Sequence, residues 1–378
     1  MSDDDRSIRS ISPDGYLKIS IRTFGNSREL LVNSDTRGEL TYEFREGRKE
    51  IPFEPEGRKW LEDVMLDVVR SSGLDARGRT ERIYSRGGLD GVLDEISRIQ
   101  SNSVMGMYFS ALLEEQKLSK RELADVAYGI AGKMSSNTDR GRLFRKYKDV
   151  FINDPEVAVA YFSAISRLTS STEKGRIYRD IDSPLGFNNP DLIEAYFAGI
   201  NRISSNTEAS SVLRHTIKNQ ELPIPAQAAA LRSTAKLSSS TEAGRVIRTF
   251  GELDFSHPMI WQSYFAAVDH IASNTERGSV LRDALKKNNF EGTSMVTFLS
   301  STRKISSSTE ISSVIRSIRK INLNDAGIRE AYFNVIRTTA STTESGRMLR
   351  YTLETHKLNQ SSMINLYETT KRISSNTE

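Results

Sequence analysis

Seven arginines recur every 34 or 35 residues and are the strongest candidates for chemistry in this chain. They are Arg145, Arg179, Arg214, Arg248, Arg282, Arg316 and Arg350. A guanidinium stays charged at physiological pH and binds carboxylates and phosphates through a rigid fork of N–H donors. One interpretation is a row of cations that holds an anionic partner. The other is a ladder in which each arginine reaches the acid or the helix-end carbonyls of an adjacent repeat.

Tyrosine-phenylalanine pairs recur with the same period and are the second candidates. Their tyrosines are Tyr161, Tyr196, Tyr264 and Tyr332. Two adjacent aromatic residues on one helix cannot both point fully inward. One of each pair is therefore a candidate for lining a concave surface that takes a peptide or a helix. The alternative interpretation is that both members belong to the core.

The remaining reactive residue types do not form a pattern. The four histidines, His215, His257, His270 and His356, occupy four different phases of the repeat, so the period places no two of them together. The chain has no cysteine, which removes thiolate metal sites and thiol nucleophiles. No spacing supplies a serine with a base. We therefore expect no enzymatic activity, no metal site and no cofactor.

The same period organises most of the chain. A threonine in the motif Ser-x-Thr followed by Glu or Asp marks it at residues 138, 172, 207, 241, 275, 309, 343 and 377, with Ser103 at the equivalent position before them. A fixed period of this size is typical of a solenoid, in which each unit buries its apolar face only against its neighbours.

Each marker is preceded by a serine and, from Ser136 onward, followed by an acidic residue. The serines of the complete units are Ser101, Ser136, Ser170, Ser205, Ser239, Ser273, Ser307 and Ser341. Serine at an N-cap with a carboxylate three residues later predicts a capping box, in which each side chain satisfies a backbone N–H of the other residue. The third residue after each marker is glycine or serine, and we attribute this small size to close approach of the neighbouring unit.

Apolar residues past each cap complete a helical stripe, and a loop then leads to the helix that carries the aromatic pairs. Two helices in 34 residues predict an αα-hairpin unit, and stacked units predict a mostly α superhelical solenoid of the HEAT or TPR type. The length matches TPR, but the Trp, Leu-Gly, Tyr and Pro positions of that repeat are absent. We therefore expect a divergent, HEAT-like repeat.

The predicted domain organisation has three parts. Residues 1–13 are a polar, flexible leader. Residues 14–100 form a small module, an antiparallel β-meander followed by helices, because short alternating segments are separated by turn signals at Gly25, Gly38 and Gly47. Residues 101–378 form eight repeats and a ninth that is cut directly after its cap. That ending favours a fragment of a longer protein.

Composition gives weak evidence about partners. The first 100 residues hold 17 basic and 20 acidic residues, and the rest hold 36 and 29. The excess of basic over acidic residues after residue 100 is too small to predict nucleic-acid binding, for which clustered Lys and Arg are expected. The sequence also contains no apolar stretch long enough to cross a membrane. We expect the partner to be another protein or a peptide, and the sequence leaves the oligomeric state open.

Several segments resemble a known group of proteins. The stretches Ile11–Ile19, Glu50–Phe53 and Arg86–Ile96, together with the Ser-Asn-Thr-Glu repeats, look like bacterial envelope-associated helical-repeat proteins. In that group the turn usually reads Ser-Asp-Tyr-Glu, and related repeats follow membrane metallopeptidase segments of the BlaR-like (M56) kind. The resemblance implies a bacterial periplasmic or envelope location, although the composition also suits the cytosol. No His-Glu-x-x-His motif is present, so no peptidase activity carries over.

These observations leave three functions open. The first is a non-catalytic protein-interaction scaffold that uses the surface of the solenoid. The second is a sensor or regulatory region of an envelope signalling protein that binds a peptide or a small ligand. The third is a solenoid that grips nucleic acid through the arginine row, which steep salt dependence of binding would reveal.

Overall fold

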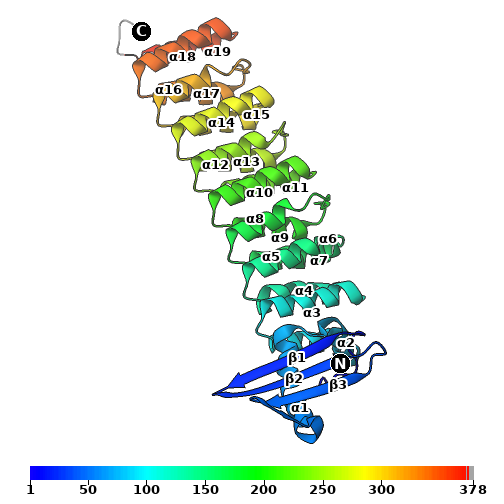
Figure 1. Cartoon of the computed structure of the whole chain (residues 1–378). Coiled ribbons are helices and arrows are strands. Elements are labelled where there is room, and N and C mark those ends of the chain that lie inside the picture. Colours follow the sequence, from blue (N-terminus) through cyan, green and yellow to red (C-terminus); the bar gives the residue numbers. More distant parts are fainter. Residues whose placement is uncertain (372, 374–378) are drawn as a thin grey trace. The chain divides into compact units, whose positions relative to one another are not determined.

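The computed structural model describes residues 1–371 and 373, and its chain divides into two compact units, Met1–Phe151 and Ile152–Glu378 (Figure 1). Both units are mostly helical, and the first also contains a small sheet, so the predicted helical-repeat fold is confirmed. The cap of the predicted ninth repeat lies outside the described residues. We describe each unit by itself.

The sheet of the first unit is the predicted meander. Its strands β1 (Tyr16–Thr23), β2 (Asn26–Ser34), β3 (Leu40–Glu46) and β4 (Lys49–Ile51) pair antiparallel in chain order. Phe24 and Gly25 form the β1–β2 turn with φ angles of 47° and 90°. Both angles are positive, as a two-residue turn needs in order to match the twist of the strands.

One face of the sheet packs on helix α1 (Arg58–Ser72), which follows the short turn η1 (Phe53–Gly57). Because side chains alternate across a strand, one face can be apolar while the other stays polar. The buried cluster joins the two elements through Ile19, Leu30, Val32 and Phe44 of the sheet and Trp60, Leu61, Met65 and Val69 of α1. Helix α1 ends at Gly73, which adopts a left-handed conformation with φ 73°.

Helix α2 (Ala76–Ser97) is interrupted at Gly88, whose φ angle of 60° is not helical. It leads to α3 (Asn102–Glu115), α4 (Lys120–Lys133), α5 (Asn137–Lys146) and α6 (Lys148–Ile152). The predicted domain boundary lies at residue 101, whereas the first unit continues beyond it to Phe151 and α2 packs along α3.

A buried ionic cluster ties residues of the predicted leader to α2. The Asp5 carboxylate pairs with Arg79 at 2.5 Å and with Arg82 at 3.0 Å, and Ile8 is buried in the module core. Arg79 also donates to Glu95 at 2.7 Å and to the Tyr108 hydroxyl at 2.8 Å. The leader therefore contributes buried contacts to the module.

Glu95 makes this cluster sensitive to acid. Burial acts to raise the pKa of its carboxyl, but hydrogen bonds from Arg70 and Arg79 hold that pKa at about 2, below the ordinary value of 4.5. A depressed carboxyl pKa adds stability that is present above pH 4.5 and is lost as the pH falls toward 2.

We expect Glu95→Gln to lower the stability of the first unit by roughly 2–3 kcal/mol at neutral pH and to flatten its loss between pH 4.5 and 2. Urea unfolding of the full chain can follow Trp60 fluorescence in a Trp261→Phe background, which removes the other tryptophan. If the unfolding free energies of the wild type and of Glu95→Gln fell in parallel between pH 4.5 and 2, the acid sensitivity would not come from Glu95.

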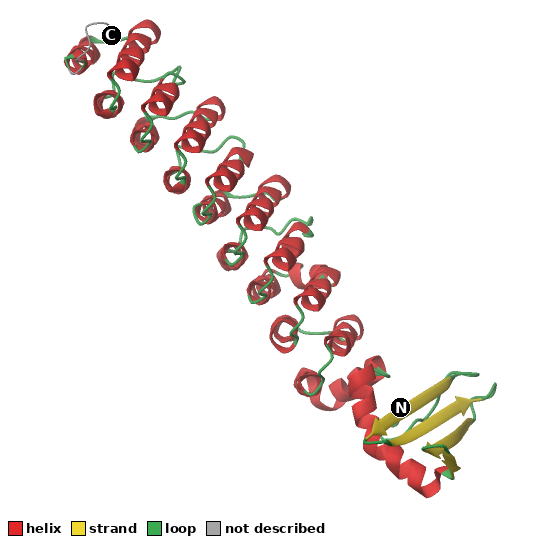
Figure 2. Cartoon of the chain, turned by 60° about the vertical axis from the view of Figure 1, so that its left-hand side comes forward, coloured by secondary structure: helices red, strands yellow, loops and turns green. Residues whose placement is uncertain are grey.

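The second unit consists of two rows of helices (Figure 2). The first helices of the repeats are α8 (Ser171–Arg179), α10 (Asn206–Asn219), α12 (Ser240–Thr249), α14 (Asn274–Lys287), α16 (Ser308–Ile315) and α18 (Thr342–Thr355). The second helices are α7 (Pro155–Ser166), α9 (Pro190–Asn201), α11 (Ile224–Thr234), α13 (Pro258–His270), α15 (Gly292–Arg303), α17 (Ala326–Thr338) and α19 (Gln360–Thr370). Each helix packs on the next helix of its own row.

The predicted capping boxes form only in half. Each cap serine accepts the backbone N–H three residues later, as expected. The reciprocal bond, from the cap N–H to the carboxylate, is absent from the repeat caps of the described residues. Among serine caps it is formed at Ser119, by Glu122 in α4. The predicted reciprocal box is therefore wrong for the repeats, because their acids point toward arginines instead.

The preceding repeat accepts the N–H groups of the cap loop. Ser240 accepts the N–H of Ser273 at 3.1 Å, and Ser308 accepts that of Ser341 at 3.3 Å. Asparagine at this first helical position bonds to the loop residue directly before the cap: Asn274 accepts the N–H of Ser306 at 3.0 Å and donates to its hydroxyl at 2.8 Å. These bonds fix each first helix to the start of the next.

Candidate functional site

The arginine row is partly used inside the protein. Three of its members pair with the acid of the following repeat: Arg179 with Glu208 at 2.7 Å, Arg248 with Glu276 at 2.6 Å and Arg282 with Glu310 at 2.8 Å. These pairs form the ladder that the sequence offers as one interpretation. Of the other members, Arg145 lies half-buried near the end of α5, and Arg350 is exposed on α18.

Two junctions break the ladder. The acids Glu242 and Glu344 pair within their own helices, with Arg245 and Arg347, each at 2.6 Å. Among the described residues no ion pair of Arg214 or Arg316 is formed, since the acid that each would meet already has a partner. The hypothesis of an anionic partner therefore applies most directly to these two arginines.

The small residue after each marker differs between the paired and the unpaired junctions. A Cβ on Gly175, Gly244 or Gly278 would overlap with the carboxylate of Glu208, Glu276 or Glu310, respectively. Serine occupies this position at Ser210 and Ser312, the two junctions that lack the inter-repeat pair. Glycine is therefore needed where a neighbour's carboxylate lies over the helix, which is the close approach that the small residues predict.

A second set of cations reaches helix-end carbonyls. Lys174 is 4% exposed and donates to the Arg202 carbonyl at 2.6 Å, and burial lowers the pKa of its ammonium. Arg277 is 9% exposed and donates to the Lys304 carbonyl at 2.8 Å. Both carbonyls lie at the ends of second helices, where a cation is favourable. Sequence reasoning assigned such contacts to the arginine row and missed these two residues.

The four candidate tyrosines are core residues. Tyr161, Tyr196, Tyr264 and Tyr332 are at most 2% exposed, and the phenylalanine that follows each is also buried. Of the two interpretations offered for these pairs, the structure agrees with the one that places both members in the core. The hydroxyls of Tyr196 and Tyr332 bond to Thr216 and Thr352 at 2.7 and 2.9 Å. Each of these two tyrosines therefore faces the row of first helices. The phenylalanine of a pair is covered by a neighbouring second helix, as Phe162 is by Tyr196 and Phe265 is by Phe298.

We expect Arg248→Ala to lower the stability of the second unit by roughly 1 kcal/mol, because it breaks an inter-repeat pair that is partly shielded from water. Arg316→Ala is the matched change at a junction without this pair and should have little effect. Thermal unfolding of the full chain by circular dichroism compares them. Equal melting temperatures would show that the ladder does not stabilise the stack.

Glycine at the third position after the marker allows a test in which two variants should change stability in opposite directions. Gly244→Ala should destabilise its unit by about 1–2 kcal/mol, because the new Cβ displaces the Glu276 carboxylate. Gly106→Ala is at the same phase of the repeat, where a Cβ would meet only Leu143 at 4.0 Å. It should stabilise by about 0.5–1 kcal/mol through helix propensity. Urea denaturation of both variants gives the two signs, and a shared sign would refute the close-approach explanation.

The second helices do not pack evenly. Helices α11 and α13, and likewise α15 and α17, pack more closely than α9 with α11, α13 with α15 or α17 with α19. At the α11–α13 and α15–α17 junctions the first helix carries an asparagine that bonds twice to the next cap loop, Asn206 and Asn274 respectively. Serine stands at the open junctions and makes one such bond, as Ser171 does with Ser204 at 2.9 Å. Alternate junctions are therefore open on the side of the second helices.

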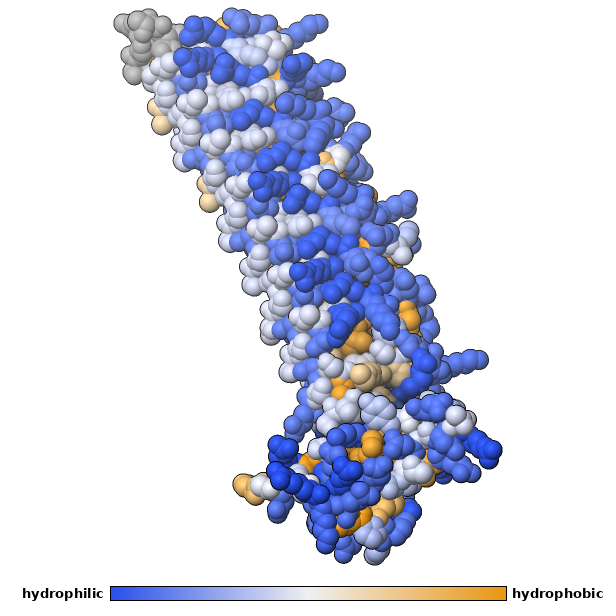
Figure 3. All heavy atoms as spheres, in the orientation of Figure 1, coloured by the Kyte–Doolittle hydropathy of each residue, from blue (hydrophilic) through white to orange (hydrophobic). Residues whose placement is uncertain are grey.

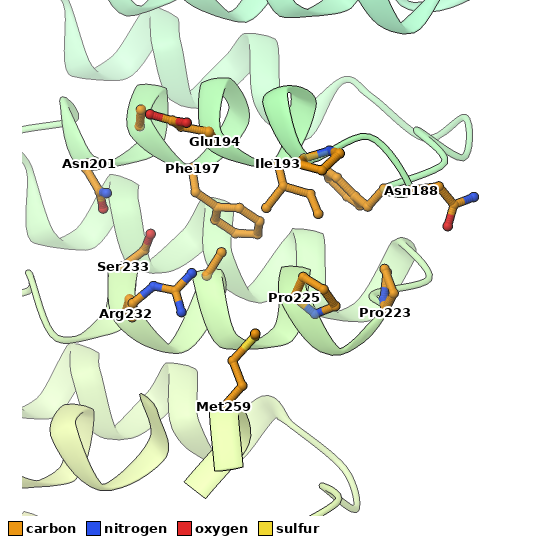
Figure 4. Close-up of a pocket in the computed structure, with 14 residues that line it drawn as sticks. Asn188, Ile193, Glu194, Phe197, Asn201, Pro223, Pro225, Arg232, Ser233 and Met259 are labelled. Carbon is orange, nitrogen blue, oxygen red and sulfur yellow. The ribbon is translucent and has the colours of Figure 1, made fainter. Parts of the chain in front are cut away.

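The open junction between α9 and α11 contains a groove of about 610 Å³ (Figure 4). Its floor is apolar: Ile193 and Phe197 come from α9, Pro225 and Ala229 from α11, and Met259 from α13. In α11 the aromatic pair is replaced by Ala230 and Leu231, both buried, and the residue before them, Ala229, lines the groove. The groove is open enough for a side chain to enter, since Met259 is 39% exposed.

Charged groups line the sides of the groove. Arg232 of α11 donates to the Ser263 hydroxyl at 3.5 Å, and its guanidinium forms no ion pair with the described residues. Glu194 of α9 is exposed on the opposite side. The lining contains no histidine, and the described part of the chain brings no three metal-binding side chains together. The chemistry available here is binding of an apolar group beside a cation.

Outside the groove, the face of the second unit that Figure 3 shows is mostly hydrophilic. A pale column at its edge is formed by the serine- and threonine-rich turns. No helix among the described residues is long and apolar enough to cross a membrane. No known protein family, curated protein or solved structure matches this chain.

Proposed function

We propose that this chain is a non-catalytic protein-interaction scaffold whose second unit holds a segment of a partner protein in the α9–α11 groove. The observation that carries the proposal is the apolar floor formed by Ile193, Phe197 and Met259, with Arg232 beside it. The groove falls within the range of roughly 300–1,000 Å³ that is common for binding sites. We also propose a bacterial envelope location for the chain, on the basis of the resemblance alone.

The rest of the second unit supports the groove over the arginine row. Three arginines of that row are engaged by carboxylates of the protein itself. An anionic partner would have to break those pairs, whereas an apolar segment entering the groove removes apolar surface from water without breaking an internal bond. The stacked helices on both sides hold the walls in place, so little ordering is needed on binding.

We expect Met259→Glu to weaken partner binding at least tenfold, because it places a charge in an apolar floor. Met363→Glu is a matched control: Met363 lies on α19, outside the groove, and the two methionines are 39% and 46% exposed. The measurement selects peptides from a random displayed library on the full chain and compares their affinity for both variants. Selected peptides that bind the wild type and both variants equally would contradict the proposal.

A further inference from the structure

We propose that the occupant of the groove is an amphipathic α-helix of a partner protein that brings a carboxylate to Arg232. This inference rests on the proposed function and adds the conformation and the charge of the partner. Three features of the groove carry it: its helical walls, its direction and its single cation.

The walls require a partner that satisfies its own backbone. Both sides of the groove are helices, α9 and α11, whose backbone groups are already bonded within each helix. The loop before α11 adds Pro223, and Pro225 stands in its first turn, so two positions lack a backbone N–H donor. An extended peptide would bury unpaired N–H and C=O groups here. A helix bonds these groups internally, and therefore fits the groove without that cost.

The direction of the groove sets the length of the contact. Its lining runs from Asn188 and Pro190 at the start of α9 to Asn201 at the last residue of that helix. Figure 4 shows this course, with Pro223 at one end and Asn201 and Ser233 at the other. Twelve residues of α9 span about 18 Å. A partner helix lying along it makes about three turns of contact, with apolar side chains at i, i+4 and i+7.

The single cation of the groove, Arg232, indicates the charge of the polar group that the partner brings. Arg232 is the residue that follows the aromatic pair position of its repeat. The equivalent residues of the other second helices are Ser163, Ala198, Ala266, Ser300, Asn334 and Glu368. A cation therefore stands at this position in α11 alone. Its guanidinium has five N–H donors, and among the described residues it uses one of them, for the 3.5 Å bond to Ser263. A carboxylate is the group that matches such a fork.

The test uses synthetic, end-blocked helical peptides of about 16 residues, which carry leucine at i, i+4 and i+7. One set places glutamate at either end of the stripe, a second set places lysine there, and a third breaks the glutamate peptides with a central proline. Fluorescence anisotropy measures their binding to the full chain. We expect a glutamate peptide to bind at least tenfold more tightly than its lysine and proline counterparts, and binding to require Met259.

Arg232→Glu should reverse the preference in favour of the lysine peptide. Arg303→Glu, a change at an exposed arginine of α15 outside the groove, should leave it unchanged. If the helical peptides fail to bind while library-selected peptides bind in a Met259-dependent way, the helical partner is contradicted and the proposed scaffold function stands. If the selected peptides bind Met259→Glu as well as the wild type, both the helical partner and the proposed function are contradicted. Self-association of the chain that Met363→Glu abolishes would assign the groove to α19 of a second copy and also overturn the inference.

Discussion

The hydrogen bond between the first helical residue of one repeat and the cap loop of the next is the interaction on which the stack depends. A helix begins with N–H groups that have no partner inside it. In this protein the cap serine accepts one of them, and the preceding repeat accepts another from the cap loop. The starts of α14 and α18 are therefore satisfied only when the previous repeat is in place. Because the carboxylate three residues after the cap is released from this task, it can pair with an arginine of its own or of the neighbouring repeat.

The side chain that makes this bond also correlates with the spacing of the second helices. Asparagine holds the next cap loop by two bonds and serine by one, and the second helices pack closely at the asparagine junctions Asn206 and Asn274. Serine in place of asparagine at the start of a first helix thus accompanies an open junction between the second helices. At the α9–α11 junction this opening is the groove, which Ala229 of α11 lines. A periodic scaffold acquires a local binding surface in this way without any change in its chain topology.

Much of this fold is predictable from the sequence because its signals are local and repeated. The serines at 101 to 341 predict every first-helix start, the glycines at 175, 244 and 278 predict a close neighbour, and alternation predicts the four strands. The sequence does not predict where the released carboxylates go, since that depends on which arginine of two repeats is nearer. It leaves both interpretations of Tyr196 and its counterparts open, because burial between two rows of helices depends on the three-dimensional packing. The groove follows from differences between repeats, such as Arg232 in α11, which a strictly periodic reading of the sequence does not single out.

Amide hydrogen exchange at the cap of α14 tests the central claim most directly. The Ser273 N–H is bonded to Ser240 of the preceding repeat, whereas the Glu276 N–H is bonded to Ser273 itself and serves as the internal reference. Our account predicts that Ser240→Ala accelerates exchange at Ser273 relative to Glu276, and that Glu276→Gln does not. Faster exchange at Ser273 in Glu276→Gln, with no change in Ser240→Ala, would show a capping box closed within one repeat and would contradict the account.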